Sequence, residues 1–183
     1  NHMFNEIRNV EIVDLNLDKE STSAPSDWLN SDLYFSSSNI SSTSNLTFID
    51  DLINSTSNFS ILHLNINSFI NHVHEINLIL ETNKFEILCF NETKLDSTIP
   101  ISFYSNTSYS MIRRDKSRRS GGLLVFIKNY YLLSIIDNGT NSNFDFEYIF
   151  IQLCIHKRKY NFVSCYKPPI DDDTIFLDKL DSF

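Results

Sequence analysis

The chain has 183 residues, of which 42% are hydrophobic and 13% aromatic, and its formal net charge is -8. This length and composition predict a globular fold of about one domain and exclude a chain that is disordered throughout. The negative balance excludes nucleic-acid binding over a broad basic surface, so any such contact has to be local.

Residues 1–58 differ in kind from the rest of the chain. Their Ser-, Thr- and Asn-rich stretches, above all 20–26 and 36–45, offer few side chains that could fill a core. Such a composition is typical of a tail or linker. Two short apolar islands, at 10–13 and 48–53, could each add a strand or a helical turn. The predicted domain therefore covers residues 59–183.

A strand, a helix and a second strand follow in that order. Apolar runs predict strands over 60–66 and 85–91, and apolar residues near helical spacing predict a helix over 70–82. The right-handed crossover rule makes the two strands parallel. Both strands end in polar residues, so these side chains are expected to gather along one edge of the sheet.

Glu92 follows the second of these strands directly. Magnesium prefers one or two carboxylates, with waters and substrate phosphate oxygens as its other ligands. A single acid delivered to the end of a buried strand is adequate for that purpose. We therefore predict a metal site at Glu92.

Short runs rich in Ile, Val, Phe and Tyr fill most of the remaining chain. They predict a meander of antiparallel strands over 109–112, 123–128, 131–136, 148–156 and 160–166, with a hairpin turn at 157–159. A helix is expected from Thr174 towards Phe183, because Asp171, Asp172 and Asp173 supply acids to its first turn.

One basic cluster lies after the first strand of this meander. It holds five of the fifteen Lys and Arg residues, namely Arg113, Arg114, Lys116, Arg118 and Arg119. If these side chains contact phosphates, affinity should fall steeply with salt. Arg113 and Arg114 should alternate across a strand, so at most one of them faces DNA.

The cysteines and the absence of long apolar stretches bear on location. Cys89, Cys154 and Cys165 lie in strand-like runs without the spacing of a zinc site or a disulfide framework, which predicts free, buried thiols in a reducing compartment. Neither a secretory leader nor a stretch of about 18 apolar residues occurs. We expect a nuclear or cytoplasmic protein that is not secreted and not bound to membranes.

Four motifs carry a family resemblance. They are Leu-Asn-Ile-Asn-Ser at 64–68, Ile-Leu-Cys-Phe-Asn-Glu-Thr-Lys-Leu at 87–95, Arg-Arg-Asp at 113–115 followed by Gly-Gly-Leu at 121–123, and Cys-Tyr-Lys-Pro-Pro at 165–169. In order and spacing they resemble the endonuclease/exonuclease/phosphatase superfamily, and within it the apurinic-type endonuclease domain of non-LTR retrotransposons. The resemblance implies a four-layer α/β sandwich.

The resemblance also implies roles for individual residues. Asn65 would hold a catalytic carboxylate or the scissile phosphate, Glu92 would bind Mg²⁺ (or Mn²⁺), and the Tyr166 hydroxyl would act on the scissile phosphate. At Asn67 the apurinic repair enzymes carry an acid that helps to bind metal, so Asn67 weakens a two-acid metal site. DNA is the implied partner, with a reverse transcriptase domain in the same parent polyprotein.

The family's later motifs are the main departure. A Gly-Asp-x-Asn motif and a late Asp-His pair, which follow the Tyr-x-Pro-Pro element in the family, do not occur here. We therefore expect a C-terminally truncated sandwich that is weakly active or inactive as a nuclease. Two alternatives stay open: a non-catalytic nucleic-acid-binding remnant, and a phosphoesterase of the same superfamily that acts on another phosphodiester.

Overall fold

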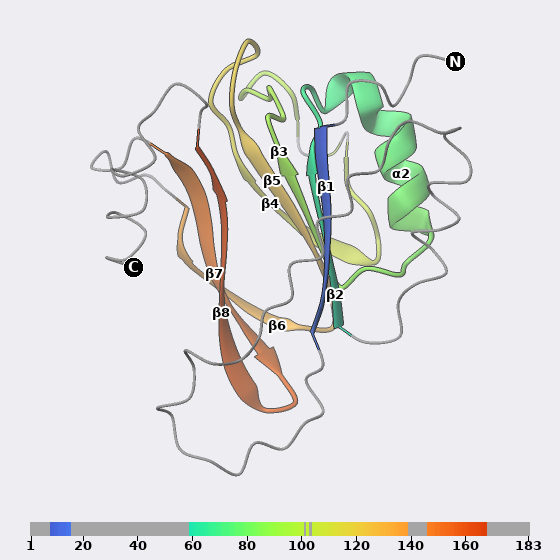
Figure 1. Cartoon of the computed structure of the whole chain (residues 1–183), viewed down its shortest axis with the longest axis vertical. Helices are drawn as coiled ribbons and strands as arrows, with labels where there is room; N and C mark the ends of the chain where they lie inside the picture. The colour runs from blue at the N-terminus through green and yellow to red at the C-terminus, as the bar shows by residue number, and fades with distance from the viewer. Residues whose placement is uncertain (1–7, 16–58, 101, 103, 139–145, 168–183) are drawn as a thin grey trace.

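The computed structural model describes residues 8–15, 59–100, 102, 104–138 and 146–167 (Figure 1). The described residues form a mixed α/β fold with two sheets, as predicted at that level. The elements are β1 (Arg8–Leu15), β2 (Phe59–Asn65), the 3-10 turn η2 (Ile70–His72), α2 (Val73–Glu81), β3 (Ile87–Asn91), β4 (Tyr109–Arg114), β5 (Leu123–Lys128), β6 (Leu132–Asp137), β7 (Glu147–Ile155) and β8 (Arg158–Tyr166).

The first sheet has the strand order β1-β2-β3-β5-β4. Strands β2 and β3 are parallel, which confirms the prediction from the crossover rule, and all other neighbours are antiparallel. Because β5 runs against β3, the connection between β4 and β5 lies at the edge where β2 and β3 end. This edge is the upper one in Figure 1.

Strand β1 is the strand that the first apolar island was expected to be able to add. The apolar island at 10–13 forms a strand that pairs antiparallel with β2, from Val10 opposite Leu64 to Leu15 opposite Phe59. The folded sheet therefore begins before residue 59, because β2 has a free edge that a short apolar segment can pair with. The other island, at 48–53, and the helix expected from Thr174 lie outside the described residues.

The predicted meander is divided between two sheets. Strands β4 and β5 complete the first sheet, whereas β6, β7 and β8 form a second, three-stranded antiparallel sheet. The hairpin turn falls at His156 and Lys157, one residue before the predicted position. Both residues have positive φ, 49° and 65°, as a two-residue turn with the right twist requires.

Two apolar layers hold these elements together. One lies between α2 and the first sheet and includes Leu64, Ile79 and Phe126, and the other lies between the two sheets and includes Val125 and Ile151. Strand β5 is buried at every position because it faces α2 on one side and the second sheet on the other. Within the described part of the chain, no helix has the length and apolar character of a membrane span.

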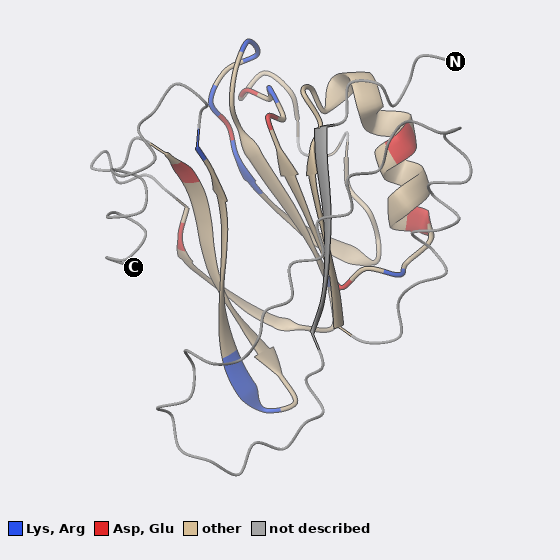
Figure 2. Cartoon of the chain, in the orientation of Figure 1, with Lys and Arg blue, Asp and Glu red and all other residues tan. Residues whose placement is uncertain are grey.

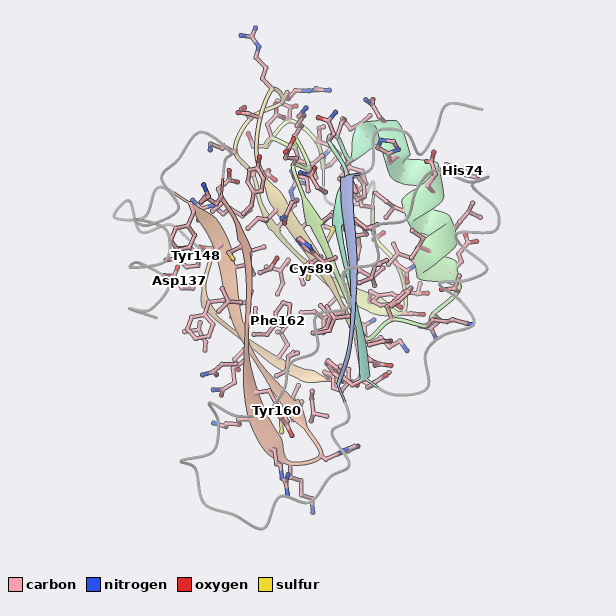
Figure 3. All side chains as sticks on the ribbon, viewed as in Figure 1. His74, Cys89, Asp137, Tyr148, Tyr160 and Phe162 are labelled. Atoms are coloured by element: carbon pink, nitrogen blue, oxygen red, sulfur yellow. The ribbon has the colours of Figure 1, made fainter. Side chains whose placement is uncertain are left out.

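All three cysteines are free, but only Cys89 is fully buried; Cys154 and Cys165 are half-buried. Figure 3 labels Cys89 and Phe162 in the layer between the sheets. Burial is the main cause that raises the pKa of the Cys89 thiol from 9.0 to about 12. The stability that this buried thiol contributes is therefore complete below pH 9.0 and is lost as the pH rises towards 12.

We expect Cys89 to resist thiol reagents in the folded protein at about pH 8, because the thiolate is the reactive form. Cys154, which is half-buried, should react first. The measurement is the rate of labelling at each cysteine, by mass spectrometry, with and without urea. Labelling of Cys89 at the same rate in both conditions would show that the layer between the sheets is open.

Candidate functional site

The fold brings the ends of several elements to one edge. Asn65 and Asn91 end the parallel strands β2 and β3, and Leu123 begins β5 opposite Asn91. In the second sheet, Glu147 begins β7 opposite Tyr166, which ends β8. We call this edge of both sheets the site edge.

Glu92 is the centre of a hydrogen-bond cluster at the site edge. Asn65 Nδ2 donates to Glu92 Oε1 over 2.8 Å, and the Tyr166 hydroxyl donates to the same oxygen over 2.9 Å. These donors come from the other parallel strand and from the second sheet, 27 and 74 positions away from Glu92 in the sequence. The three residues expected to carry the chemistry are therefore in direct contact.

The Tyr166 hydroxyl is held in its protonated form. Burial raises the pKa of Tyr166 well above its ordinary value, and the hydrogen bond to Glu92 and the negative charges of Glu92 and Glu147 raise it further. Around neutral pH this hydroxyl is a hydrogen-bond donor. It can orient a carboxylate, or an anionic substrate oxygen that takes the carboxylate's place.

Left-handed backbone conformations gather around Glu92. Asn67, Ser68, Glu92 and Lys94 all have positive φ, from 48° to 145°. Asn67 is suited to this conformation, and its N–H donates to Asn65 Oδ1 over 3.3 Å. For the other three residues the conformation costs on the order of 1–3 kcal/mol each, and such strain persists where the surroundings hold it, often at functional sites.

The donor set fits magnesium that is bound through a single carboxylate. Among the described residues, no three His, Cys, Asp or Glu side chains gather in a way that could hold a metal ion. Asn67 Oδ1 accepts a hydrogen bond from the Lys94 ammonium, so it is engaged with a cation already. Asn65 and Tyr166 both donate to Oε1 of Glu92, and neither of these two hydrogen bonds goes to Oε2. Magnesium that takes one carboxylate oxygen and fills its other positions with water and phosphate fits these residues.

Glu147 is a site-edge residue that the sequence analysis missed. Its side chain is 4% exposed and bonds to the connection between β4 and β5. Gly122 N–H donates to Glu147 Oε2 over 2.7 Å, and Lys116 Nζ donates to Oε1 over 3.0 Å. A signal in the sequence could have found it. Glu147 stands at an odd-numbered position of β7, and every other odd-numbered residue of that strand is apolar and buried.

The basic cluster divides into paired and exposed side chains. Arg113 donates to Asp115 and to the carbonyl oxygens of Asp96 and Ile99, over 2.5 to 2.9 Å, and it is 10% exposed. This differs from the expected phosphate contact, because binding a phosphate would break those bonds. Arg118 and Arg119 are exposed at the tip of the connection, which is blue in Figure 2.

Arg114 is also partly engaged within the molecule. Its Nη1 donates to the carbonyl oxygen of Asn138 over 3.3 Å, and its guanidinium lies 5.8 Å from the centre of the Tyr148 ring. Arg113 and Arg114 thus do alternate as predicted, but both meet protein groups.

A scan against protein-family models finds no match for this chain, and a search of curated proteins finds none either.

Proposed function

We propose that this chain is the N-terminal part of a magnesium-dependent DNA endonuclease domain, of the endonuclease/exonuclease/phosphatase type found in non-LTR retrotransposons. The observation that carries the proposal is the shared oxygen of Glu92, which Asn65 and Tyr166 both contact. The proposal includes a nuclear or cytoplasmic site of action and a reverse transcriptase domain in the same polyprotein, for which the nick would supply a primer end.

The proposed chemistry assigns a task to each residue. Asn65 fixes the rotamer of Glu92, and Tyr166 supplies a donor that a phosphate oxygen can accept. Bound to Glu92, with waters and phosphate oxygens as its other ligands, magnesium would stabilise negative charge on the scissile phosphate. Arg118 and Arg119 would contact backbone phosphates, which gives local DNA binding in an acidic protein.

The proposed fold is the four-layer sandwich, of which helix, sheet and sheet are the described layers. Leu132 on β6 supports a further layer over the second sheet. It lies opposite Cys154, on the face of the sheet turned away from the layer between the sheets, and it is 75% exposed.

Plasmid nicking and DNA binding test the proposal together. With magnesium we expect slow nicking or none, because the family's general base is missing from the sequence and such a base contributes about 10²–10⁴-fold. Any nicking should disappear with a chelator and in Glu92→Ala, but not in Glu81→Ala, an exposed acid at the end of α2. A fluorescent duplex should bind in either case, and binding should weaken with salt.

The possible outcomes separate the alternatives. Nicking that survives both the chelator and Glu92→Ala would contradict the assigned site. Binding without nicking, in a protein that magnesium does not stabilise against urea, would favour a non-catalytic DNA-binding remnant. Failure to bind DNA, together with hydrolysis of a different phosphodiester, would favour another phosphoesterase of the superfamily.

A further inference from the structure

Glu147 joins the second sheet to a loop of the first. Its carboxylate is almost excluded from water, and a buried carboxylate needs partners that compensate for lost hydration. Both partners, Lys116 and Gly122, belong to the connection between β4 and β5, which we call the basic loop (residues 115–122). The basic loop connects two strands of the first sheet but is bonded to Glu147 of β7, in the second sheet.

The backbone of the basic loop is fitted closely to this ion pair. A Cβ atom added to Gly121 would lie 2.3 Å from Glu147 Oε1 and 2.6 Å from Lys116 Cδ. Gly121 therefore approaches the pair more closely than any other residue type could. This is a second observation, separate from the hydrogen bonds, that the loop is held at Glu147.

The same carboxylate borders the cluster around Glu92. Glu147 is the ladder partner of Tyr166, directly opposite it in the second sheet. Tyr166 in turn donates to Glu92. One side chain thus touches the basic loop and neighbours the residue that orients Glu92.

We propose that Glu147 is a positioning residue that determines which cations of the basic loop face DNA. It holds Lys116 as an anchor, so that the loop presents Arg118 and Arg119 to phosphates at the site edge. If Lys116 moved away, the buried Glu147 carboxylate would keep the Gly122 N–H but lose its only cation partner among the described residues, which is costly. Arg118 and Arg119, by contrast, are exposed. This inference rests on the proposed DNA-binding function.

Amide hydrogen exchange in the free protein tests the anchoring without DNA. Glu147→Gln keeps the shape of the side chain and an acceptor for the Gly122 N–H but loses the negative charge. Lys116→Met removes the positive charge of the same ion pair. Both should raise exchange across residues 115–122. Glu86→Gln is the matched control, because Glu86 pairs with Lys128 over 3.0 Å and precedes β3, at the edge opposite Glu92. Exchange in the loop that stays at the wild-type rate in both variants would overturn the anchoring.

The salt dependence of binding to a fluorescent duplex tests which cations face DNA. Binding falls with salt, and each phosphate contact adds about 0.9 to the steepness of that fall, the magnitude of the slope of log K against log salt, which we call the slope. Arg118→Ala and Arg119→Ala should each lower the slope by about 0.9, whereas Lys116→Ala should leave it unchanged. In the Glu147→Gln background the slope should rise by about 0.9, because Lys116 is released, and Lys116→Ala should then remove that increase.

Three results would separate the two proposals. A lower slope for Lys116→Ala in the wild-type background would make Lys116 a phosphate ligand, and it would overturn the inference while DNA binding stands. Unchanged slopes for Arg118→Ala and Arg119→Ala would overturn it in the same way. No binding by the wild type would overturn the proposed function, and with it the presentation of the loop to DNA, whatever the exchange rates show.

Discussion

Gly122→Ala is expected to lower the free energy of unfolding by about 3 kcal/mol or more, as the sum of backbone strain and overpacking. Gly122 has a φ of 92°, which L side chains rarely adopt, and an added Cβ would lie 2.4 Å from Thr93 Oγ1. Thr93 is fully buried, so its hydroxyl cannot turn out to solvent. Urea unfolding followed by circular dichroism measures the loss.

Two further variants separate the causes of that loss. Gly121→Ala should cost a similar amount, because its Cβ would lie 2.3 Å from the buried Glu147 Oε1, but Thr93→Ala should not relieve that loss. Thr93→Ala in the Gly122→Ala background should recover the overpacking term but not the backbone strain. A Gly122→Ala protein within about 0.5 kcal/mol of the wild type would show that this edge is loosely packed.

Gly122 also links stability to the site. Its carbonyl accepts the Thr93 N–H over 3.2 Å, and its own N–H donates to Glu147 over 2.7 Å. A shift of Gly122 would therefore move the residue next to Glu92 and weaken the attachment of the basic loop. We expect Gly122→Ala to reduce DNA binding even at temperatures where the variant is folded.

Individual strands were predictable, and so were the pairs joined by a helix or a hairpin, but the other partners were not. Alternation and apolar runs indicate where a strand lies, as for β5, predicted and found over Leu123–Lys128. The same patterns do not say which strand pairs with which. Strand β5 lies beside β3 because its two apolar faces can be covered there, by α2 and by the second sheet. A simple meander would have left one face exposed.

The part of the site that follows from the order of neighbouring elements along the chain was predictable. Asn65 ends one of two parallel strands joined by a helix and Glu92 directly follows the other, and that topology alone brings them to one edge. Glu147 shows the limit of this reasoning. Its partners lie 31 and 25 positions away in the sequence, so only the packing of one sheet on the other brings them together.

The charged residues show a second limit. A count of cations in a sequence does not show which are already paired, and Arg113 proved to be bound by Asp115 and two carbonyl groups. An arginine guanidinium has several N–H donors, so it can hydrogen-bond to the carbonyl oxygens of a neighbouring loop as readily as to phosphates. That Arg118 and Arg119 are exposed while Arg113 is bonded within the protein became clear only from the position of the loop around Asp96.

Asn65→Asp is the other substitution with a large expected effect. It would place a second carboxylate where the Asn65 amide now donates to Glu92 Oε1 over 2.8 Å. Two unit charges 4 Å apart repel by about 4 kcal/mol at an effective dielectric constant near 20, and solvent reduces this because Asn65 is half-buried. We expect a loss of about 2 kcal/mol in the free energy of unfolding at neutral pH, measured by urea unfolding.

The pH dependence distinguishes this repulsion from simple loss of a hydrogen bond. At low pH the two carboxyl groups can hold one proton between them, which restores a donor, so the stability of Asn65→Asp should return on acidification and be lost again as the pH rises. The deficit of Asn65→Ala, which only removes the donor, should not follow this profile. Adding Glu92→Gln to Asn65→Asp exchanges donor and acceptor and should restore stability at neutral pH. If the double variant is no more stable than Asn65→Asp alone, the two side chains are not in contact, and the cluster on which the proposed nuclease site depends does not form.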